Sequence, residues 1–355
     1  MRVCWLWSSV LLLASCLSAQ AEPVADPCSF PISNPADVTL KLELKGSQSV
    51  YHEGEIIPLE YAFAASTNDH YVLASGTYPQ RQPGSIDSFC VSPDGRDPLE
   101  DYFQSGIWIA WPVSNTFNFV PLNGSPQVIS AVLNEWKSLP PGDYTLRVVS
   151  NQVGSPAELG HGAGRIVVAS NTVAFRVVAA TPEWQSEQLK QVLSVLDTPH
   201  KMLTQSELEQ EEHAMRVLRY LGSEAATREL ARRFWFYDQP SQPPQLRHPA
   251  PYPDYWQYVL EIGFWDFERG LIGSPFRAIA IRELRHEIED HRHPGTWQMV
   301  PTLALLEIQS SPGYPRLFLH DTSHKDEREK QQQAKQAAYG KIVDNLWERV
   351  GGAKP

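Results

Sequence analysis

The sequence lacks an excess of positive charge. Lys and Arg together number 30 against 41 Asp and Glu, which gives a net charge of −11 at pH 7. Proteins that bind nucleic acid carry basic patches that neutralise phosphates, and non-specific attraction to an anionic membrane surface also requires positive charge. We therefore expect no nucleic-acid partner and no electrostatic adhesion to a membrane.

The chain also lacks the motifs that accompany well-known catalytic chemistry. It contains no G-x-S-x-G nucleophile elbow, no S-x-x-K pair, no P-loop and no G-x-G-x-x-G dinucleotide loop. The glycine-rich stretch 160–164 lies between two expected strands with no helix after it, so it is interpreted as a hairpin loop. These absences predict a protein that is not an enzyme and holds no cofactor.

Histidines at a metal-binding spacing are few. His286 and His291 are five residues apart, so on a helix their rings do not share a face, as zinc requires. His320 and His324 are four apart and could share a metal on a helix. However, Pro and Gly residues precede them, and the stretch 321–323 has the character of a helix cap. We expect a structural or solvated role for both histidines and no bound metal.

The N-terminal apolar run, residues 3–14, is too short to cross a bilayer comfortably, because a transmembrane helix takes about 20 apolar residues. It follows Arg2 and precedes Ala19-Gln20-Ala21, a small-residue pattern typical of a signal-peptide cleavage site. Residues 1–21 are therefore predicted to be a signal peptide, and the protein is predicted to be secreted or periplasmic.

A second interpretation of this segment remains open. Residues 13–16, Leu-Ala-Ser-Cys, resemble a bacterial lipobox, in which Cys16 would be lipidated and become the first residue of the mature protein. Such a lipid supplies the acyl chains that stable anchoring requires, and residues 17–35 would be a flexible tether. The chain is then a membrane-anchored lipoprotein, and it contacts the membrane only if Cys16 is modified. With cleavage after Ala21, residues 22–36 are the linker to the first domain.

Cysteine is scarce, with four residues in total. Cys4 and Cys16 belong to the export segment, which leaves Cys28 and Cys90 if cleavage follows Ala21. A pair of cysteines in an exported chain is a candidate disulfide, which here would tie the N-terminal lead-in to the first domain. The spacing does not establish that the two residues approach each other.

Residues 37–180 carry apolar residues at alternate positions in short runs bounded by Gly, Pro, Asn or Asp, as is typical of an antiparallel sandwich. The turn at 139–144 and the strand that opens at 170–173 resemble the closing hairpin of bacterial immunoglobulin-like modules. The Cys–Trp–Cys spacing of antibody domains is missing. The resemblance implies an Ig-like β-sandwich. The expected strands cover 38–44, 57–63, 86–91, 107–111, 128–133, 144–149, 166–168 and 173–177.

Near residue 180 the spacing of the apolar residues changes to the spacing that is typical of helices. Gly222-Ser223 and Gly273-Ser274 are expected to end one helix and cap the next. A Pro-rich insertion at 239–253 interrupts the pattern, and the whole helical region covers 181–350. The expected helices are 183–196, 207–221, 224–236, 255–269, 276–288, 297–308 and 325–350. The fold class is therefore multidomain, all-β followed by all-α.

Two of the expected helix pairs have similar sequences at the turn between their helices. Leu221-Gly222-Ser223 is matched by Ile272-Gly273-Ser274 at the same kind of turn, and without the insertion their separation is close to one α-α solenoid unit. The stretch 212–234 resembles a HEAT-type repeat, which implies a HEAT-like solenoid over 181–350. A non-repetitive helical bundle is the alternative.

Aromatic residues mark two candidate binding surfaces. Trp108 and Trp111 are three residues apart, so on one strand they point to opposite faces, and an exposed ring could stack on a sugar. Packing in the core is the alternative. Tyr255 and Trp256 follow the Pro-rich insertion, a long loop that could lie across the helices or act as a spacer.

The architecture favours a function in binding. Helical solenoids offer an extended surface to a protein partner, so we expect an exported, non-enzymatic binding or scaffold protein of the cell envelope that engages a protein through residues 181–350. One alternative is a carbohydrate-binding module on the sandwich. Another is a metal-dependent hydrolase with its site between the domains, which predicts a bound metal that is lost when His320 and His324 are changed to Ala.

Overall fold

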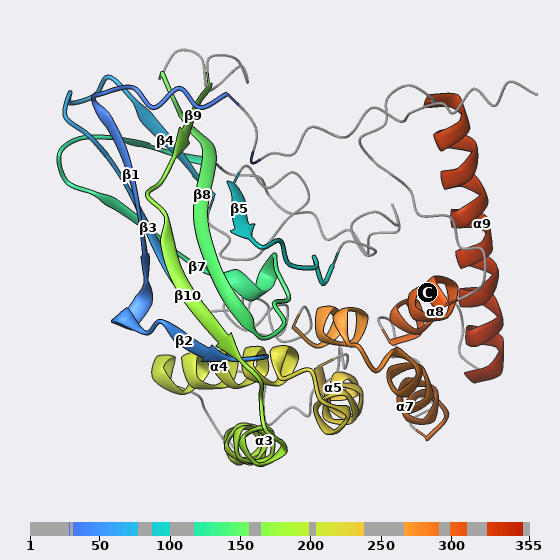
Figure 1. Cartoon of the computed structure of the whole chain (residues 1–355). Helices are drawn as coiled ribbons and strands as arrows, with labels where there is room; N and C mark the ends of the chain where they lie inside the picture. Colours follow the sequence, from blue (N-terminus) through green and yellow to red (C-terminus); the bar gives the residue numbers. More distant parts are fainter. Residues whose placement is uncertain are drawn as a thin grey trace, which may run out of the picture.

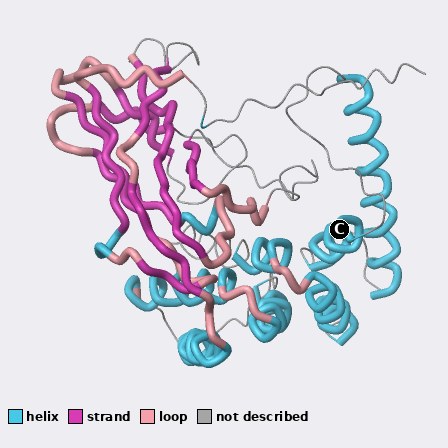
Figure 2. Tube along the Cα trace, viewed as in Figure 1, coloured by secondary structure: helices cyan, strands magenta, loops and turns pink. Residues whose placement is uncertain are grey.

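The chain has two parts, with β-sheets in its N-terminal half and helices in its C-terminal half (Figures 1 and 2). Within the described chain, no helix combines the length and the apolar character needed to cross a membrane. The computed structural model describes residues 28, 31–76, 87–99, 117–155, 165–198, 204–237, 266–290, 299–310 and 325–350.

Two sheets form the β part. The smaller sheet has the order β1-β3-β7, and the larger has the order β2-β10-β8-β4-β6, with β5 and β9 also paired to β8. All pairs are antiparallel except β10 with β2. The strands are β1 (Val38–Leu44), β2 (Val50–His52), β3 (Pro58–Ala65), β4 (Val72–Gly76), β5 (Asp87–Ser92), β6 (Phe117–Pro121), β7 (Gln127–Val132), β8 (Gly142–Gly154), β9 (Arg165–Ala169) and β10 (Val173–Val178).

One apolar core joins the two sheets. Along β1 and β3 buried and more exposed residues alternate strictly, so each strand turns one face inward. Leu42 and Phe63 from the smaller sheet and Leu146 and Val148 from the larger one are fully sealed from solvent and belong to the same cluster. The period-two pattern of the sequence therefore places the core correctly.

Three short strands, β2, β4 and β6, have no counterpart among the expected strands. The reason for β2 is its length, since three residues cannot display a period. Its partner is β10, beside which it runs in parallel from Val50 to His52. The expected strand at 107–111 lies outside the described residues.

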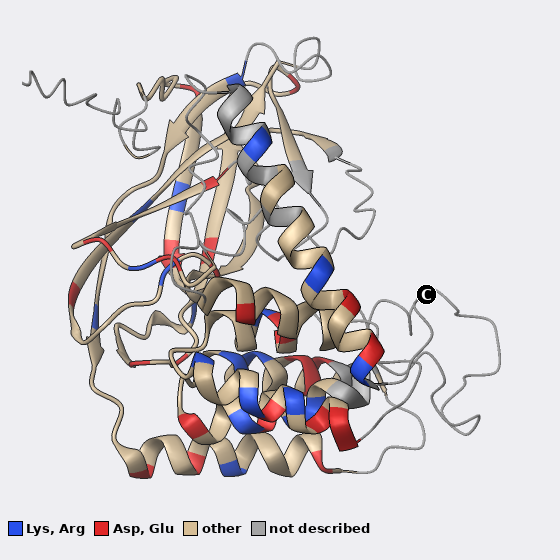
Figure 3. Cartoon of the chain, turned by 90° about the vertical axis from the view of Figure 1, so that its right-hand side faces the viewer, with Lys and Arg blue, Asp and Glu red and all other residues tan. Residues whose placement is uncertain are grey.

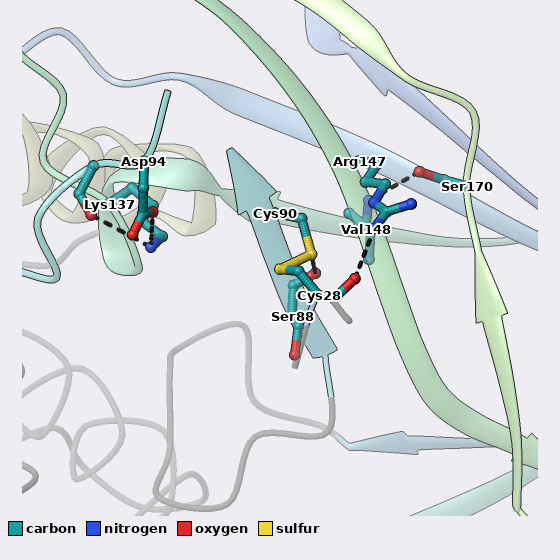
Figure 4. Close-up of a disulfide and its surroundings, with 9 residues drawn as sticks. Cys28, Ser88, Cys90, Asp94, Lys137, Arg147, Val148 and Ser170 are labelled. Atoms are coloured by element: carbon teal, nitrogen blue, oxygen red, sulfur yellow. Dashed lines mark hydrogen bonds and ion pairs between the residues drawn. A yellow bond between two sulfur atoms is a disulfide. The ribbon is translucent and has the colours of Figure 1, made fainter. Parts of the chain in front are cut away.

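A disulfide ties the start of the described chain to the larger sheet. Cys28 and Cys90 are joined, with their Cα atoms 5.7 Å apart (Figure 4). The guanidinium of Arg147, on the neighbouring strand β8, donates to the carbonyl oxygen of Cys28 at 2.7 Å. Further along, the amide of Ser33 donates to the carbonyl of Val167. The segment before β1 is thus fastened against the sheets.

The helices lie close to their expected positions. The structure gives α3 (Pro182–Leu196), α4 (Gln205–Tyr220), α5 (Glu224–Tyr237), α7 (Arg277–Asp290), α8 (Met299–Ser310) and α9 (Lys325–Val350). Ser223 caps α5 by accepting a hydrogen bond from the amide of Ala226 at 3.1 Å, as the Gly-Ser pattern predicts. Thr204 and Glu207 form a capping box at the start of α4, which places this helix start two residues earlier than expected.

The expected helix end at Arg269 is wrong. Residues 266–273 are helical, so the helix continues to Gly273. Gly270 does not stop it, because its role is close packing: a Cβ there would lie 2.9 Å from a methyl carbon of Leu230 on α5. The remainder of the expected helix, 255–265, lies outside the described residues, as does the insertion at 239–253.

A second apolar core holds the helices together. It includes residues of every described helix, with α8 buried almost all round. One member comes from the β part: Leu99, which follows β5, is 1% exposed and lies among the helical side chains. The sheets therefore insert a side chain into the core of the helices.

Candidate functional site

Charged side chains meet in a buried cluster where the sheets join the helices. We call it the junction cluster and define it as Glu135, Arg219, Tyr220, Asp266 and Arg269. The guanidinium of Arg219 donates to both carboxylate oxygens of Glu135, at 2.7 and 3.0 Å, and to Oδ1 of Asp266 at 2.9 Å. Arg269 reaches Glu135 at 3.4 Å, and the hydroxyl of Tyr220 also donates to it.

Local structure brings these residues together from three distant segments. Glu135 ends a 3-10 turn, Leu133–Glu135, that follows β7. Arg219 lies in the last turn of α4. Asp266 and Arg269 are three residues apart in the helical segment 266–273, so they lie on one face of it. The cluster therefore joins one turn of the sheets to two helices.

The four charged side chains of the junction cluster are buried. Glu135 is 2%, Arg219 7%, Asp266 0% and Arg269 4% exposed. Burial alone would raise the pKa of Glu135, but Arg219 and Arg269 outweigh it and hold this pKa below its ordinary value. Burial, helped by the charge of Glu135, raises the pKa of Asp266. The ion pair of Glu135 with Arg219 is thus the charged centre of the cluster.

A cleft lined by both polar and apolar side chains lies beside this cluster, between the sheets and the helices. Its volume is about 320 Å³, and both parts of the chain line it. Arg96, Asn134 and Lys137 line it from the sheets. Thr227 and Ser274 line it from the helices, and their hydroxyl oxygens are 2.7 Å apart. We call it the junction cleft.

Tight contacts fix the two walls of the junction cleft. Gly54, in the turn after β2, has a φ of +84°, and a Cβ there would lie 2.8 Å from the carbonyl oxygen of Tyr220. The ring of His52 stacks on Trp184 of α3, with centroids 4.6 Å apart. These contacts, with Leu99 and the junction cluster, hold the sheets and helices in one arrangement. A ligand therefore meets a preformed cleft.

A further buried carboxyl lies on the same helical segment. Glu268 is 0% exposed, and neither of its carboxylate oxygens has a hydrogen-bond partner. The hydroxyl of Thr302 on α8 lies close enough to favour the ionised form of Glu268. The two side chains are not aligned for a hydrogen bond, however. Burial dominates and raises the pKa of Glu268 to about 7.

Two common catalytic arrangements are absent from the described residues. Among the residues described, no histidine is hydrogen-bonded to a serine, threonine or cysteine, the usual arrangement of an activated nucleophile. The same residues contain no group of three or more His, Cys, Asp or Glu placed to hold a metal ion. The junction cleft is lined by positively charged side chains, such as Arg96 and Lys137, and by negatively charged ones, such as Glu53 and Glu55.

Most of the residues singled out from the sequence lie outside the described chain. This applies to the lipidation candidate Cys16, the aromatic candidates Trp108, Trp111, Tyr255 and Trp256, and the histidine candidates His320 and His324. Of the site predictions, only Cys28 and Cys90 fall within it, and they are bonded to each other.

Sequence reasoning missed the junction cluster altogether. Glu135 and Arg219 are charged residue types that usually lie at the surface, and nothing in the sequence around either one indicates that they pair. One signal was present: Asp266, Glu268 and Arg269 fall within the strongly apolar stretch 262–272, where charged residues need buried partners.

No protein-family model matches the chain, and no curated protein or solved structure is found to be similar to it.

Proposed function

We propose that this chain is an exported, non-enzymatic binding protein of the cell envelope. It holds a protein partner through its helical part, and the junction cleft accepts a segment of that partner. The observation that carries the proposal is the cleft itself, which is preformed, has a mixed polar and apolar lining, and is walled by both parts of the chain. The expectation of export comes from the N-terminal segment 1–21 and, in the lipoprotein form, from Cys16.

The helices offer a broad polar surface next to this cleft. Arginine–carboxylate pairs bridge successive helices: Arg228 reaches Glu283 at 2.7 Å from α5 to α7, and Arg285 reaches Glu307 at 2.8 Å from α7 to α8. Figure 3 shows the resulting mixture of positive and negative residues on the helices. Such exposed pairs add little stability, whereas arginine is enriched at protein interfaces. The surface therefore suits a protein partner.

Site-specific photo-cross-linking in an envelope extract tests this function. A photoreactive amino acid replaces Arg96 at the cleft, Arg232 on the outer face of α5 or, as a control, Lys41 on β1. All three positions are exposed. We expect the first two to capture the same protein and the control to capture none. Equal capture from Lys41, or no adduct from the first two, would refute the proposal.

The finer fold assignments are part of the proposal. An Ig-like sandwich is supported by the hydrogen bond from the hydroxyl of Tyr144 to the carbonyl of Pro140, at 2.6 Å, which resembles a tyrosine corner. A HEAT-like solenoid is supported by the contacts that link α3 to α4, α5 to α7, α7 to α8 and α8 to α9. An experimental structure in which α4–α5 fails to superpose on 266–273 and α7 would contradict the repeat.

A second function is carbohydrate binding by the sheets. Phe119 on β6 is 48% exposed, and an exposed aromatic ring can stack on a sugar. Calorimetric titration with a panel of oligosaccharides tests it: binding should be present in the wild type and lost in Phe119→Ala. A panel without any binding would remove this alternative.

A further inference from the structure

The fully buried Glu268 lies within electrostatic range of Tyr339 on the last described helix, α9. Thr302 of α8 is near its carboxylate, and Tyr339 of α9 is near enough for the charge of Glu268 to raise the pKa of the Tyr339 phenol, in addition to burial. Three unpartnered polar atoms, both oxygens of Glu268 and the hydroxyl of Thr302, are enclosed here. A buried carboxylate without partners is strongly disfavoured.

The charged and titratable groups around Glu268 are few. Arg269, its neighbour on the helical segment 266–273, favours the ionised carboxylate, but its guanidinium is also directed to Glu135 in the junction cluster. From α8 the neighbour is Thr302, which does not titrate. From α9 it is Tyr339, whose phenol stays neutral. No cation dedicated to Glu268 faces it among the described residues, so the proton is its main means of neutralisation.

Among the described side chains of α9, those that pack on the helical core lie in its C-terminal half. Leu346 and Trp347 are buried in the helical core, and Tyr339 and Ile342 pack against it. Toward the N-terminus, Gln333, Ala334, Ala337 and Ala338 are exposed. The outer link, from Arg349 to Glu289 of α7, is an exposed ion pair of 2.9 Å, which contributes little. The described contacts that undocking of α9 would break therefore lie mainly in its last three turns.

We propose that α9 is a pH-sensitive strap: it packs on the helical core while Glu268 is protonated, and it is released when Glu268 is ionised. Release admits water to the carboxylate and exposes the apolar face of α8. The titration falls near neutrality, since the pKa of the buried carboxyl is about 7. The device does not depend on the proposed function, because it is a property of the isolated chain.

Hydrogen exchange of the wild-type chain between pH 5 and 8, corrected for the intrinsic exchange rate, tests this proposal. With a docked pKa of about 7 and an ordinary value of about 4.5 on release, protection of α9 should fall about seventyfold over this range. Amides of α3 and α4 in the same molecule are the reference and should change much less. Equal changes in α9 and α4, or none in α9, would overturn the proposal.

Two variants test whether Glu268 is the source of the pH dependence of α9. Glu268→Gln keeps the shape of the side chain but cannot ionise, so protection of α9 should become independent of pH. Glu289→Gln, the matched control, removes a carboxylate that contacts α9 from outside and should retain the wild-type pH dependence. Retention of that dependence in Glu268→Gln would assign it to another group. If that variant does not fold, the wild-type comparison of α9 with α4 still decides.

Discussion

Glu135 and Arg219 are 84 residues apart in the sequence and form a two-pronged ion pair that is sealed from solvent, with N–O distances of 2.7 and 3.0 Å. Glu135 belongs to the sheets and Arg219 to the helices. The fork of the guanidinium matches the carboxylate, which fixes orientation as well as distance. The pair therefore sets the angle at which the helices meet the sheets.

Replacing Glu135 by Ala should be strongly destabilising, because it leaves Arg219 and Arg269 buried without their shared carboxylate. Breaking one side of a buried pair costs about 3–5 kcal/mol in the free energy of unfolding. Urea unfolding measures the change. Glu60→Ala removes the exposed pair with Lys45, 3.1 Å long, and should change it by less than about 1 kcal/mol. Similar losses in the two variants would contradict the role given to the cluster.

Leu99→Ala tests the side chain that the sheets insert into the helical core. Truncating a fully buried leucine costs about 2–5 kcal/mol through lost burial and the cavity that remains. We expect a loss in this range, and we expect hydrogen-exchange protection in α5 to fall. The control is Val50→Ala, since Val50 is 50% exposed and should change stability little. A loss limited to the sheets would show that Leu99 does not support the helices.

Gly54→Ala and Gly46→Ala form a matched pair. Both glycines have positive φ, +84° and +75°, so each substitution incurs similar backbone strain of about 1–2 kcal/mol. Around Gly46 there is no atom within 4 Å of the added methyl group, whereas at Gly54 the methyl would meet the carbonyl oxygen of Tyr220 at 2.8 Å. Thermal unfolding should therefore show the larger loss for Gly54→Ala. Equal losses would mean that the turn and α4 are not in tight contact.

The double variant Cys28→Ser, Cys90→Ser measures the contribution of the disulfide. The bond closes a loop with a sequence separation of 62 residues. In the chain-entropy model a loop of this length contributes about 4 kcal/mol to the stability of the folded state. Urea unfolding of the oxidised wild type and of the variant should differ by an amount of this order. A reduced wild type that is as stable as the oxidised one would argue against a structural role.

Stability should also depend on pH through Glu268. Its folded pKa, about 7, lies above the ordinary value of about 4.5, so the folded chain holds a proton that the unfolded chain releases. Stability is therefore lost as the pH rises from about 4.5 to 7, by up to about 3 kcal/mol. Urea unfolding at pH 5 and 8 should show this loss in the wild type but not in Glu268→Gln. A loss of the same size in both would exclude Glu268 as its source.

The sequence predicts the helices and strands better than the contacts between them. The helices followed from apolar stripes and from local caps such as Ser223, because these signals act over a few residues. The capping box of Thr204 and Glu207 is a local signal of the same kind. Glu135 and Arg219 are each of a residue type that usually lies at the surface. Their pairing could not be predicted from the sequence, because a buried ion pair depends on tertiary packing. The same holds for Leu99, whose neighbours in the helical core come from segments more than 90 residues later.

The position of Leu99 has a consequence for biosynthesis. The ribosome makes the sheets first, and the strands through β10 are complete before α3 begins. At that stage Leu99 has no helical core to enter, because that core is built from side chains of α3 and the later helices. Glu135 has no cation, because its partners are Arg219 and Arg269. The nascent sheets must carry an exposed apolar side chain and an unpaired acid until the helices emerge. The N-terminal half therefore reaches its final form only when the C-terminal half has been synthesised.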